Sequence, residues 1–236
     1  MTNQRSTTET PRASDDRQRG VSPWRRRGAP VLGCGDSGLY AALRIVCALF
    51  IMPLYRYSAR GGENVPRSGG VILAVSHKSW WDPVFVGMAL ERPMRSMAKA
   101  ELFRAWWSRS VVTALGGHPI RRGQSDVEAL RASLDILAAG EVLLMFPEGH
   151  RYHDDVIYPF RAGISLLASR GGCPVVPVAI RGTKKMAAHK LPHFPRVRVA
   201  IGPALDLSGL QGSAKERHEA AAERARRAVE QLYGSL

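Results

Sequence analysis

Short apolar runs bounded by turn residues recur along most of this chain. A short, continuous apolar run between glycine or proline residues is typical of a buried strand. Such runs lie at 71–75, 141–146, 173–180 and 196–201. We therefore predict four buried strands at these positions.

Amphipathic stretches separate these runs and predict helices. Ser125 and Glu128 form a capping box, and apolar residues follow at helical spacing until Gly140 ends the helix. Ser213 and Glu216 start an Ala-rich helix to Tyr233 in the same way, and shorter helices are predicted at 83–90 and 163–169. Alternating strands and helices favour the α/β class, with a mixed sheet flanked by helices.

The most hydrophobic long segment, residues 39–55, lies near the N-terminus. A membrane-spanning helix needs about 20 mostly apolar residues, and Arg44 and Pro53 interrupt this one. We expect an interfacial helix that lies on a membrane, with Arg56 and Arg60 at the level of acidic headgroups. A buried core helix and a single tilted span are the alternatives.

The chain is thus expected to have three parts. Residues 1–30 are rich in Arg, Ser, Thr and Asp and read as a disordered basic tail. Residues 31–57 form the membrane-associating helical segment, and residues 58–236 form one folded domain.

Net charge indicates the possible binding partners, and cysteine content indicates the redox compartment. The 34 Lys and Arg residues outnumber the 20 Asp and Glu residues, which gives a formal net charge of +14. Such a surface attracts polyanions: nucleic acid, anionic lipid headgroups or phosphorylated substrates. The three cysteines match neither a disulfide framework nor a zinc motif, which indicates a reducing compartment.

His77 and Asp82 are the strongest candidates for chemistry. They are separated by four residues and follow the predicted strand at 71–75, and open α/β sheets bind ligands beyond the carboxyl ends of their strands. A carboxylate that binds one imidazole nitrogen leaves the other free to act as a general base. The alternative is structural: Asp82 before Pro83 also suits the N-cap of a helix.

Three further segments join this pair in a recognisable order. They are Gly116–Arg122 (GGHPIRR), Phe146–Arg151 (FPEGHR) and Val176–Ile180 (VPVAI). Together with His77 and Asp82 they resemble the four ordered blocks of the glycerolipid acyltransferases, in particular the bacterial 1-acylglycerol-3-phosphate acyltransferases. The resemblance covers roughly residues 55–205 and implies that residues 58–236 adopt the fold of that family.

The resemblance also implies roles for individual residues. His77 and Asp82 match the catalytic pair, and Lys99, Arg122 and Arg151 match cations expected to bind the substrate phosphate. Guanidinium groups bind phosphate bidentately, and lysine acts as a point charge.

Glu148 and Gly149 match acceptor-binding positions in the third block, and Glu148 alternatively suits the cap of a turn. Two positions depart from the usual pattern: Ser76 replaces an asparagine, and His150 replaces a threonine.

The expected reaction transfers a fatty acyl group to the free hydroxyl of lysophosphatidic acid. The donor is acyl-CoA or acyl carrier protein, and no cofactor or metal is expected, since His150, His153, Asp154 and Asp155 suit surface polar residues better than metal ligands. The expected location is the cytoplasmic face of the cell membrane, as a peripheral or monotopic protein on anionic lipid.

Three alternatives remain. One is a glycerol-3-phosphate or other lysophospholipid acyltransferase. Another is an inert lipid-binding protein on the same fold. The last is a nucleic-acid-binding protein, which we do not expect because no groove-reading or stacking motif occurs.

Overall fold

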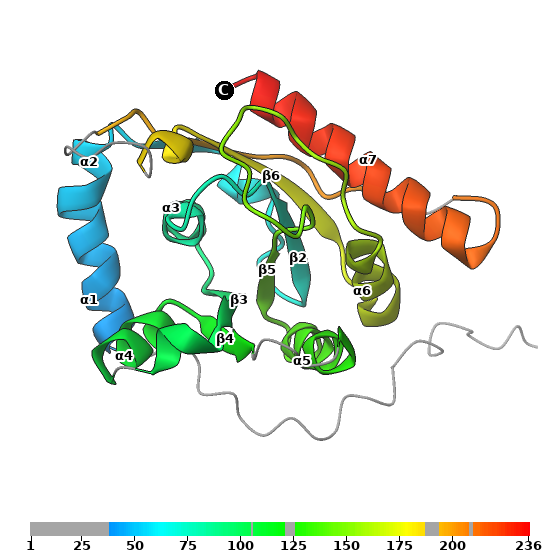
Figure 1. Ribbon diagram of the computed structural model, residues 1–236, viewed down its shortest axis with the longest axis horizontal. Coiled ribbons are helices and arrows are strands. Elements are labelled where there is room, and N and C mark those ends of the chain that lie inside the picture. The colour runs from blue at the N-terminus through cyan, green and yellow to red at the C-terminus, as the bar shows by residue number, and fades with distance from the viewer. Residues whose placement is uncertain (1–37, 105, 121–125, 187–193, 208–209) are drawn as a thin grey trace, which may run out of the picture.

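A seven-stranded sheet runs through the middle of the molecule, with helices on both of its faces (Figure 1). The computed structural model describes residues 38–104, 106–120, 126–186, 194–207 and 210–236. The strands are β1 (Ser58–Arg60), β2 (Val71–Val75), β3 (Met94–Lys99), β4 (Gly117–Ile120), β5 (Val142–Met145), β6 (Val175–Arg181) and β7 (Arg198–Ile201).

The strand order is β1-β7-β6-β2-β5-β3-β4. All neighbouring pairs are parallel except β6 and β7, which are antiparallel. The predicted mixed sheet is therefore confirmed, as are the four predicted strands. Strands β1, β3 and β4 were not predicted, because β1 is exposed and because Arg95 and Ser96 in β3, and Pro119 in β4, interrupt the apolar runs.

Helices of different length cover the two faces. They are α1 (Gly38–Val46), the π-helical turn η2 (Cys47–Ile51), α2 (Met52–Leu54), α3 (Asp82–Met88), α4 (Trp106–Ala114), α5 (Asp126–Ala138), α6 (Gly163–Gly171) and α7 (Ala214–Gly234), with 3₁₀ turns η3 (Gly62–Asn64), η4 (Ala100–Phe103) and η5 (Thr183–Met186). The capping box of Ser213 and Glu216 is confirmed at the start of α7. The capping box predicted at Ser125 lies partly outside the described residues.

Two apolar layers form the core, one on each side of the sheet. Helices α5, α6 and α7 pack on the side where Ile72 and Ala74 of β2 point. Helix α3 packs on the other side, through Phe85 and Val86, against Leu73 and Val75. All five residues of β2 are fully buried, because this central strand carries apolar side chains toward both layers.

The N-terminal helical segment α1–η2–α2 lies outside the core. None of its residues is buried, so the interpretation of residues 39–55 as a core helix is wrong. Arg44 faces the domain: its guanidinium donates to the carbonyl oxygen of Leu90 at 3.1 Å and to that of Gly87 at 3.5 Å, just past and within α3. Among the described residues, no helix is long and apolar enough to cross a membrane.

Candidate active site

The first predicted site segment lies at the carboxyl edge of the parallel strands. Strand β2 ends at Val75, and His77 follows two residues later. Strand β5, which pairs with β2 in parallel, ends at Met145 and leads directly into the Phe146–Arg151 segment. The parallel register therefore brings the first and third sequence blocks together, although about 70 residues separate them.

His77 and Asp82 form a hydrogen-bonded pair. The Nδ1 atom of His77 lies 2.9 Å from Oδ2 of Asp82. The same carboxylate oxygen accepts from the backbone N–H groups of Lys78 at 2.7 Å and Ser79 at 2.8 Å. Asp82 is the first residue of α3, and Trp81 holds the N-cap position, so the predicted capping role is wrong. The carboxylate instead orders the loop that carries His77.

The imidazole of His77 is held on a second side by an aromatic ring. It stacks on Phe146, with ring centroids 3.7 Å apart and an interplanar angle of 15°. The His77 side chain is 16% exposed. Because Asp82 occupies Nδ1, the nitrogen left for a substrate is Nε2.

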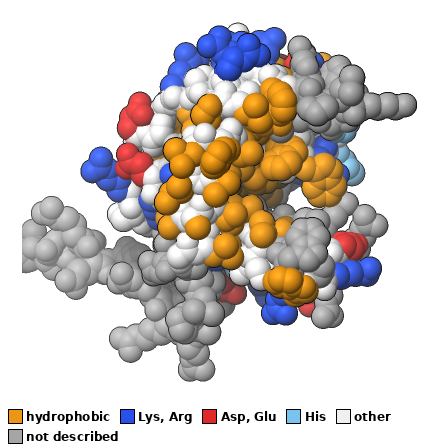
Figure 2. Space-filling view, turned by 90° about the vertical axis from the view of Figure 1, so that its left-hand side faces the viewer, with side chains coloured by type: hydrophobic (Ala, Val, Ile, Leu, Met, Phe, Trp, Pro, Cys, Tyr) orange, Lys and Arg blue, Asp and Glu red, His pale blue; other side chains and the backbone are white. Residues whose placement is uncertain are grey.

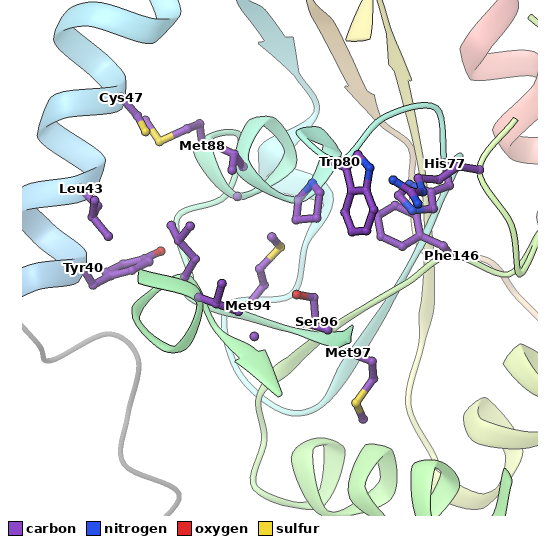
Figure 3. Close-up of a pocket in the computed structure, with 18 of the residues that line it drawn as sticks. Tyr40, Leu43, Cys47, His77, Trp80, Met88, Met94, Ser96, Met97 and Phe146 are labelled. Atoms are coloured by element: carbon purple, nitrogen blue, oxygen red, sulfur yellow. The ribbon is translucent and has the colours of Figure 1, made fainter. Parts of the chain in front are cut away.

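An elongated cavity of about 370 Å³ begins at His77 and extends to helix α1 (Figure 3). Its wall comes from α1, α3, β3, α4 and the loops after β2 and β5, and most of its side chains are apolar. Tyr40 and Leu43 of α1 and Cys47 of η2 close one end, and Met88 and Met94 lie between that end and the His77–Phe146 pair. The cavity therefore offers an apolar chain a path that starts at the imidazole.

Arg151 lies at the His77 end of this cavity. Its guanidinium carbon is 3.4 Å from the centre of the Trp80 ring, which fixes the cation by stacking. Burial lowers the pKa of Arg151, and the nearby Asp82 carboxylate opposes that shift. A guanidinium remains charged near neutral pH despite such a shift, so a cation stands beside the imidazole.

Glu148 is buried behind the catalytic loop, whereas Gly149 lines the cavity. Both oxygens of the buried Glu148 carboxylate accept from backbone amides, Oε1 from His77 at 2.9 Å and Oε2 from Tyr158 at 3.3 Å. Gly149 lines the cavity, but its N–H donates to the carbonyl oxygen of Phe146, so that amide is not free for an oxyanion. The acceptor contact assigned to these two residues stays a prediction.

Glycine suits position 149 because the backbone there has a positive φ. Its φ is +76°, and an added Cβ would lie 2.6 Å from Nε of Arg161. The Arg161 guanidinium thus rests directly on the loop, and its Nη2 is 3.3 Å from Nε2 of His150. Sequence reasoning missed Arg161, which follows the third block by ten residues.

The other predicted phosphate ligands are less well placed by the structure. Lys99 is the last residue of β3, so its backbone reaches the same edge of the sheet as the His77 loop. Arg122 lies outside the described residues. Their contacts with a substrate phosphate stay predictions.

The two departures from the family pattern lie in different environments. Ser76 is fully buried, and its hydroxyl accepts from the backbone N–H of Ile180 at 3.4 Å. It therefore joins β2 to β6 and does not line the cavity. His150, in contrast, is exposed and lines the cavity beside Arg151.

No pattern in the sequence indicates that the lysine after His77 is buried. Lys78 is 1% exposed, and its ammonium lies 3.6 Å from Oε2 of Glu148. Phe146 was also missed as a stacking partner of His77. Neither could be found from the sequence, because both depend on the contact between two loops.

The described residues contain no group of three or more His, Cys, Asp or Glu side chains that could hold a metal ion. Asp154 and Asp155, considered above as metal ligands, contact other groups. Asp154 accepts from the Tyr158 hydroxyl at 2.8 Å, and Asp155 pairs with Lys184.

Comparison with known proteins identifies the family. The sequence profile of the acyltransferase family matches residues 56–181, which include His77, Asp82 and the Phe146–Arg151 segment. This chain belongs to the acyltransferase family. The predicted resemblance is therefore confirmed.

Similar acyltransferases occur in several bacteria. A 1-acyl-sn-glycerol-3-phosphate acyltransferase of Bacillus subtilis is 29% identical over 189 residues, which is 76% of this chain and 92% of that protein. One from Streptococcus pneumoniae is 28% identical and covers 80% of this chain and 71% of its own length. The crystal structure of a 1-acyl-sn-glycerophosphate (LPA) acyltransferase, PlsC, from Thermotoga maritima superposes with a TM-score of 0.60 at 23% identity, over 84% of this chain and 85% of that one. It confirms the acyltransferase fold.

Proposed function

We propose that this acyltransferase moves a fatty acyl group from an acyl thioester to the free hydroxyl of 1-acylglycerol 3-phosphate, which forms phosphatidic acid. The observation that carries the proposal is the His77–Asp82 pair at the end of an apolar cavity. The names of the relatives from Bacillus subtilis and Streptococcus pneumoniae support the choice of acceptor.

The pair acts as a general base. Nε2 of His77 takes the proton of the acceptor hydroxyl while the hydroxyl oxygen attacks the thioester carbonyl carbon. The new C–O bond forms, the C–S bond breaks, and the thiolate of coenzyme A or acyl carrier protein leaves with the proton from the imidazolium. Asp82 stabilises that imidazolium during the transfer.

Cations at the His77 end bind the acceptor phosphate. Arg151 is held there by the Trp80 ring, and its planar donors suit a phosphate dianion. Lys99 and Arg122 are proposed as further phosphate ligands on the basis of the sequence blocks. This arrangement directs the acceptor headgroup to the imidazole.

The acyl chain of the donor occupies the apolar cavity. Its thioester carbonyl then lies near His77, and its hydrocarbon tail extends toward Leu43 of α1 and Cys47 of η2 (Figure 3). Burial of a hydrocarbon chain contributes about 0.8 kcal/mol per CH₂ group. The length of the cavity therefore sets the preferred acyl chain.

The same N-terminal segment holds the acyltransferase on the membrane. Ile45, Val46, Leu49 and Phe50 are between 48% and 66% exposed, and Figure 2 shows the apolar face that they join, with Lys and Arg side chains gathered at one end.

This arrangement suits peripheral or monotopic attachment to anionic lipid on the cytoplasmic face. Exposed arginines of the adjoining segments supply the cations for that lipid: Arg56, Arg60, Arg196 and Arg198.

A product analysis tests the reaction. Purified protein is incubated with labelled acyl-CoA or acyl carrier protein and with 1-acylglycerol 3-phosphate, glycerol 3-phosphate or a zwitterionic lysophospholipid, and products are identified by mass. We expect phosphatidic acid as the main product. A preference for glycerol 3-phosphate or for the zwitterionic acceptor refutes the proposed acceptor.

The role of His77 is tested in the same assay. His77→Ala removes the base, and general acid–base help is worth about 10²–10⁴-fold, so turnover should fall by at least that range. His153→Ala, at an exposed histidine that does not line the cavity, serves as the matched control. A folded His77→Ala protein with wild-type turnover contradicts the proposed mechanism.

A further inference from the structure

Lys78 carries a buried positive charge close to the dyad. Its side chain is 1% exposed, and lysine is almost never fully buried unless it is paired. The ammonium donates to the carbonyl oxygen of Val156 at 2.5 Å and lies 3.6 Å from Oε2 of Glu148 and 3.9 Å from Oδ1 of Asp154. Lys78 does not line the cavity, so it cannot reach the reacting atoms there.

Glu148 carries the carboxylate nearest to this ammonium, and it binds the backbone of the catalytic loop. Its Oε1 accepts from the N–H of His77 at 2.9 Å, and its Oε2 accepts from the N–H of Tyr158 at 3.3 Å. The carbonyl oxygen of His77 accepts from the N–H of Tyr152 at 3.1 Å. Both backbone polar groups of His77 are therefore held by residues 148–158.

The backbone of Lys78 serves the other member of the dyad. Its N–H donates to Oδ2 of Asp82 at 2.7 Å, the oxygen that also binds His77. One residue thus contacts Asp82 through its main chain and Glu148 through its side chain. The rings of Tyr152 and Tyr158 stack on each other with centroids 3.7 Å apart, and their centres lie 5.9 Å and 6.0 Å from the ammonium.

We propose that Lys78 and Glu148 are positioning residues that fix the His77 imidazole against the cavity. The ammonium lies 3.6 Å from the buried Glu148 carboxylate, and that carboxylate holds His77 by its N–H. Glu148 then acts through His77 and not as a ligand of the acceptor. This inference rests on the proposed acyl transfer.

Three variants separate this role from acceptor binding. Lys78→Met keeps the length of the side chain and removes its charge, which leaves the Glu148 carboxylate buried without a cation. Glu148→Gln removes the other charge, and the double variant removes both. Loss of one member of a buried ion pair is more harmful than loss of both, so the double variant should recover activity.

The matched control is Lys184→Met. Lys184 pairs with Asp155, in the same loop as Val156, but it has no contact with Glu148 among those that the structure gives. It reports the effect of removing a lysine ion pair from this loop without disturbing the dyad. Turnover of this control should stay within twofold of wild type.

Steady-state kinetics supplies the first readout, with kcat normalised to the folded fraction from circular dichroism. For Lys78→Met we expect kcat to fall by roughly 10–100-fold while KM for the acceptor stays within threefold. The double variant should turn over at least threefold faster than Lys78→Met. Unchanged kcat, a raised acceptor KM with unchanged kcat, or a double variant slower than Lys78→Met would each overturn the proposal.

A spectroscopic readout does not depend on the substrate. The proton between Nδ1 of His77 and Asp82 should give a downfield NMR signal that is assigned by its loss in His77→Ala. Lys78→Met should shift or broaden this signal, and Lys184→Met should leave it in place. If wild type shows no acyl transfer, the proposed function fails, and an unchanged signal in Lys78→Met still overturns the positioning role.

If Lys78→Met does not fold, the double variant with Lys78→Met and Glu148→Gln tests whether the pair positions His77. Without either buried charge, it should fold with kcat below that of wild type. Wild-type kcat and an unchanged downfield signal in a folded double variant would show that the pair does not position His77.

Discussion

Replacing Asp82 by asparagine tests the electrostatic part of the dyad separately from its geometry. One oxygen of Asp82, Oδ2, accepts from His77, Lys78 and Ser79. An asparagine oxygen in that place can keep all three hydrogen bonds and the same imidazole tautomer. Asp82→Asn therefore removes the negative charge and retains the arrangement of the loop.

The expected loss follows from the 2.9 Å separation of Nδ1 and Oδ2. At an effective dielectric constant of about 20, two unit charges at that distance attract by about 6 kcal/mol. An imidazole that carries half of the proton's charge in the transition state gains about half of that energy. Half of about 6 kcal/mol is about 3 kcal/mol, and since about 1.4 kcal/mol corresponds to a tenfold rate, kcat should fall by about 10²-fold with little change in KM.

The same change has a separate effect on stability. The other oxygen of Asp82, Oδ1, is buried and has no hydrogen-bond partner among the described residues, so the asparagine NH₂ would be buried there without an acceptor. An unsatisfied buried donor costs about 1–3 kcal/mol. Denaturant unfolding should show a lower free energy of unfolding by that amount.

The assay measures labelled phosphatidic acid at saturating substrate, normalised to folded protein. Asp135→Asn, at an exposed aspartate on α5, makes the same chemical change away from the site and should leave kcat unchanged. An Asp82→Asn protein that turns over within threefold of wild type would refute the claim that the carboxylate stabilises the imidazolium.

Three further predictions concern membrane binding, the acyl-chain preference set by the cavity, and the pH dependence of the melting temperature. Phe50→Glu, at a residue that is 66% exposed on η2, should release protein from anionic vesicles in a flotation assay without loss of fold; full retention argues against this face. Cys47→Phe should fill the α1 end of the cavity and move the preference toward shorter acyl donors in a competition assay, whereas Ala48→Phe, exposed and outside the cavity, should not. Hydrogen bonds from Lys184 and from the Tyr233 hydroxyl lower the pKa of Asp155. Its ionised form therefore stabilises the fold above the unfolded pKa of about 3.9, and this contribution disappears as the pH falls through the lower folded value. Asp155→Asn should accordingly lower the melting temperature at pH 7 and approach wild type in acid, and an equal difference at both pH values would contradict this cause.

The first and third site segments could be placed from the sequence because they follow the strands predicted at 71–75 and 141–146, which have a clear apolar pattern. His77 was expected beyond the carboxyl end of 71–75, and β2 confirms that place. Strand β3 was missed because the buried Arg95 is paired with the partly exposed Glu141, and such a charged residue has the same sequence pattern as a solvated surface.

The contacts of individual charged residues could not be predicted from the sequence. Asp82 before Pro83 suits a helix cap equally well, and only the fold shows its carboxylate turned back to Lys78 and Ser79. Arg44 interrupts an apolar helix in the sequence, yet in the structure it binds carbonyl oxygens of α3 and leaves the apolar side chains outside.

The sequence by itself determined the fold class, the two strands that lead into the His77 and Glu148 loops, and the dyad as the candidate base. These follow from local patterns, since strand periodicity, turns and motif spacing are properties of neighbouring residues. The tertiary structure decided which loops meet. Parallel pairing of β2 with β5 brings the Glu148 carboxylate to the backbone N–H of His77. The same contact between loops places Glu148 and the carbonyl oxygen of Val156 next to the buried ammonium of Lys78. A buried charge needs a partner because leaving water is costly, and partners that lie 70 residues apart are found only when the chain has folded.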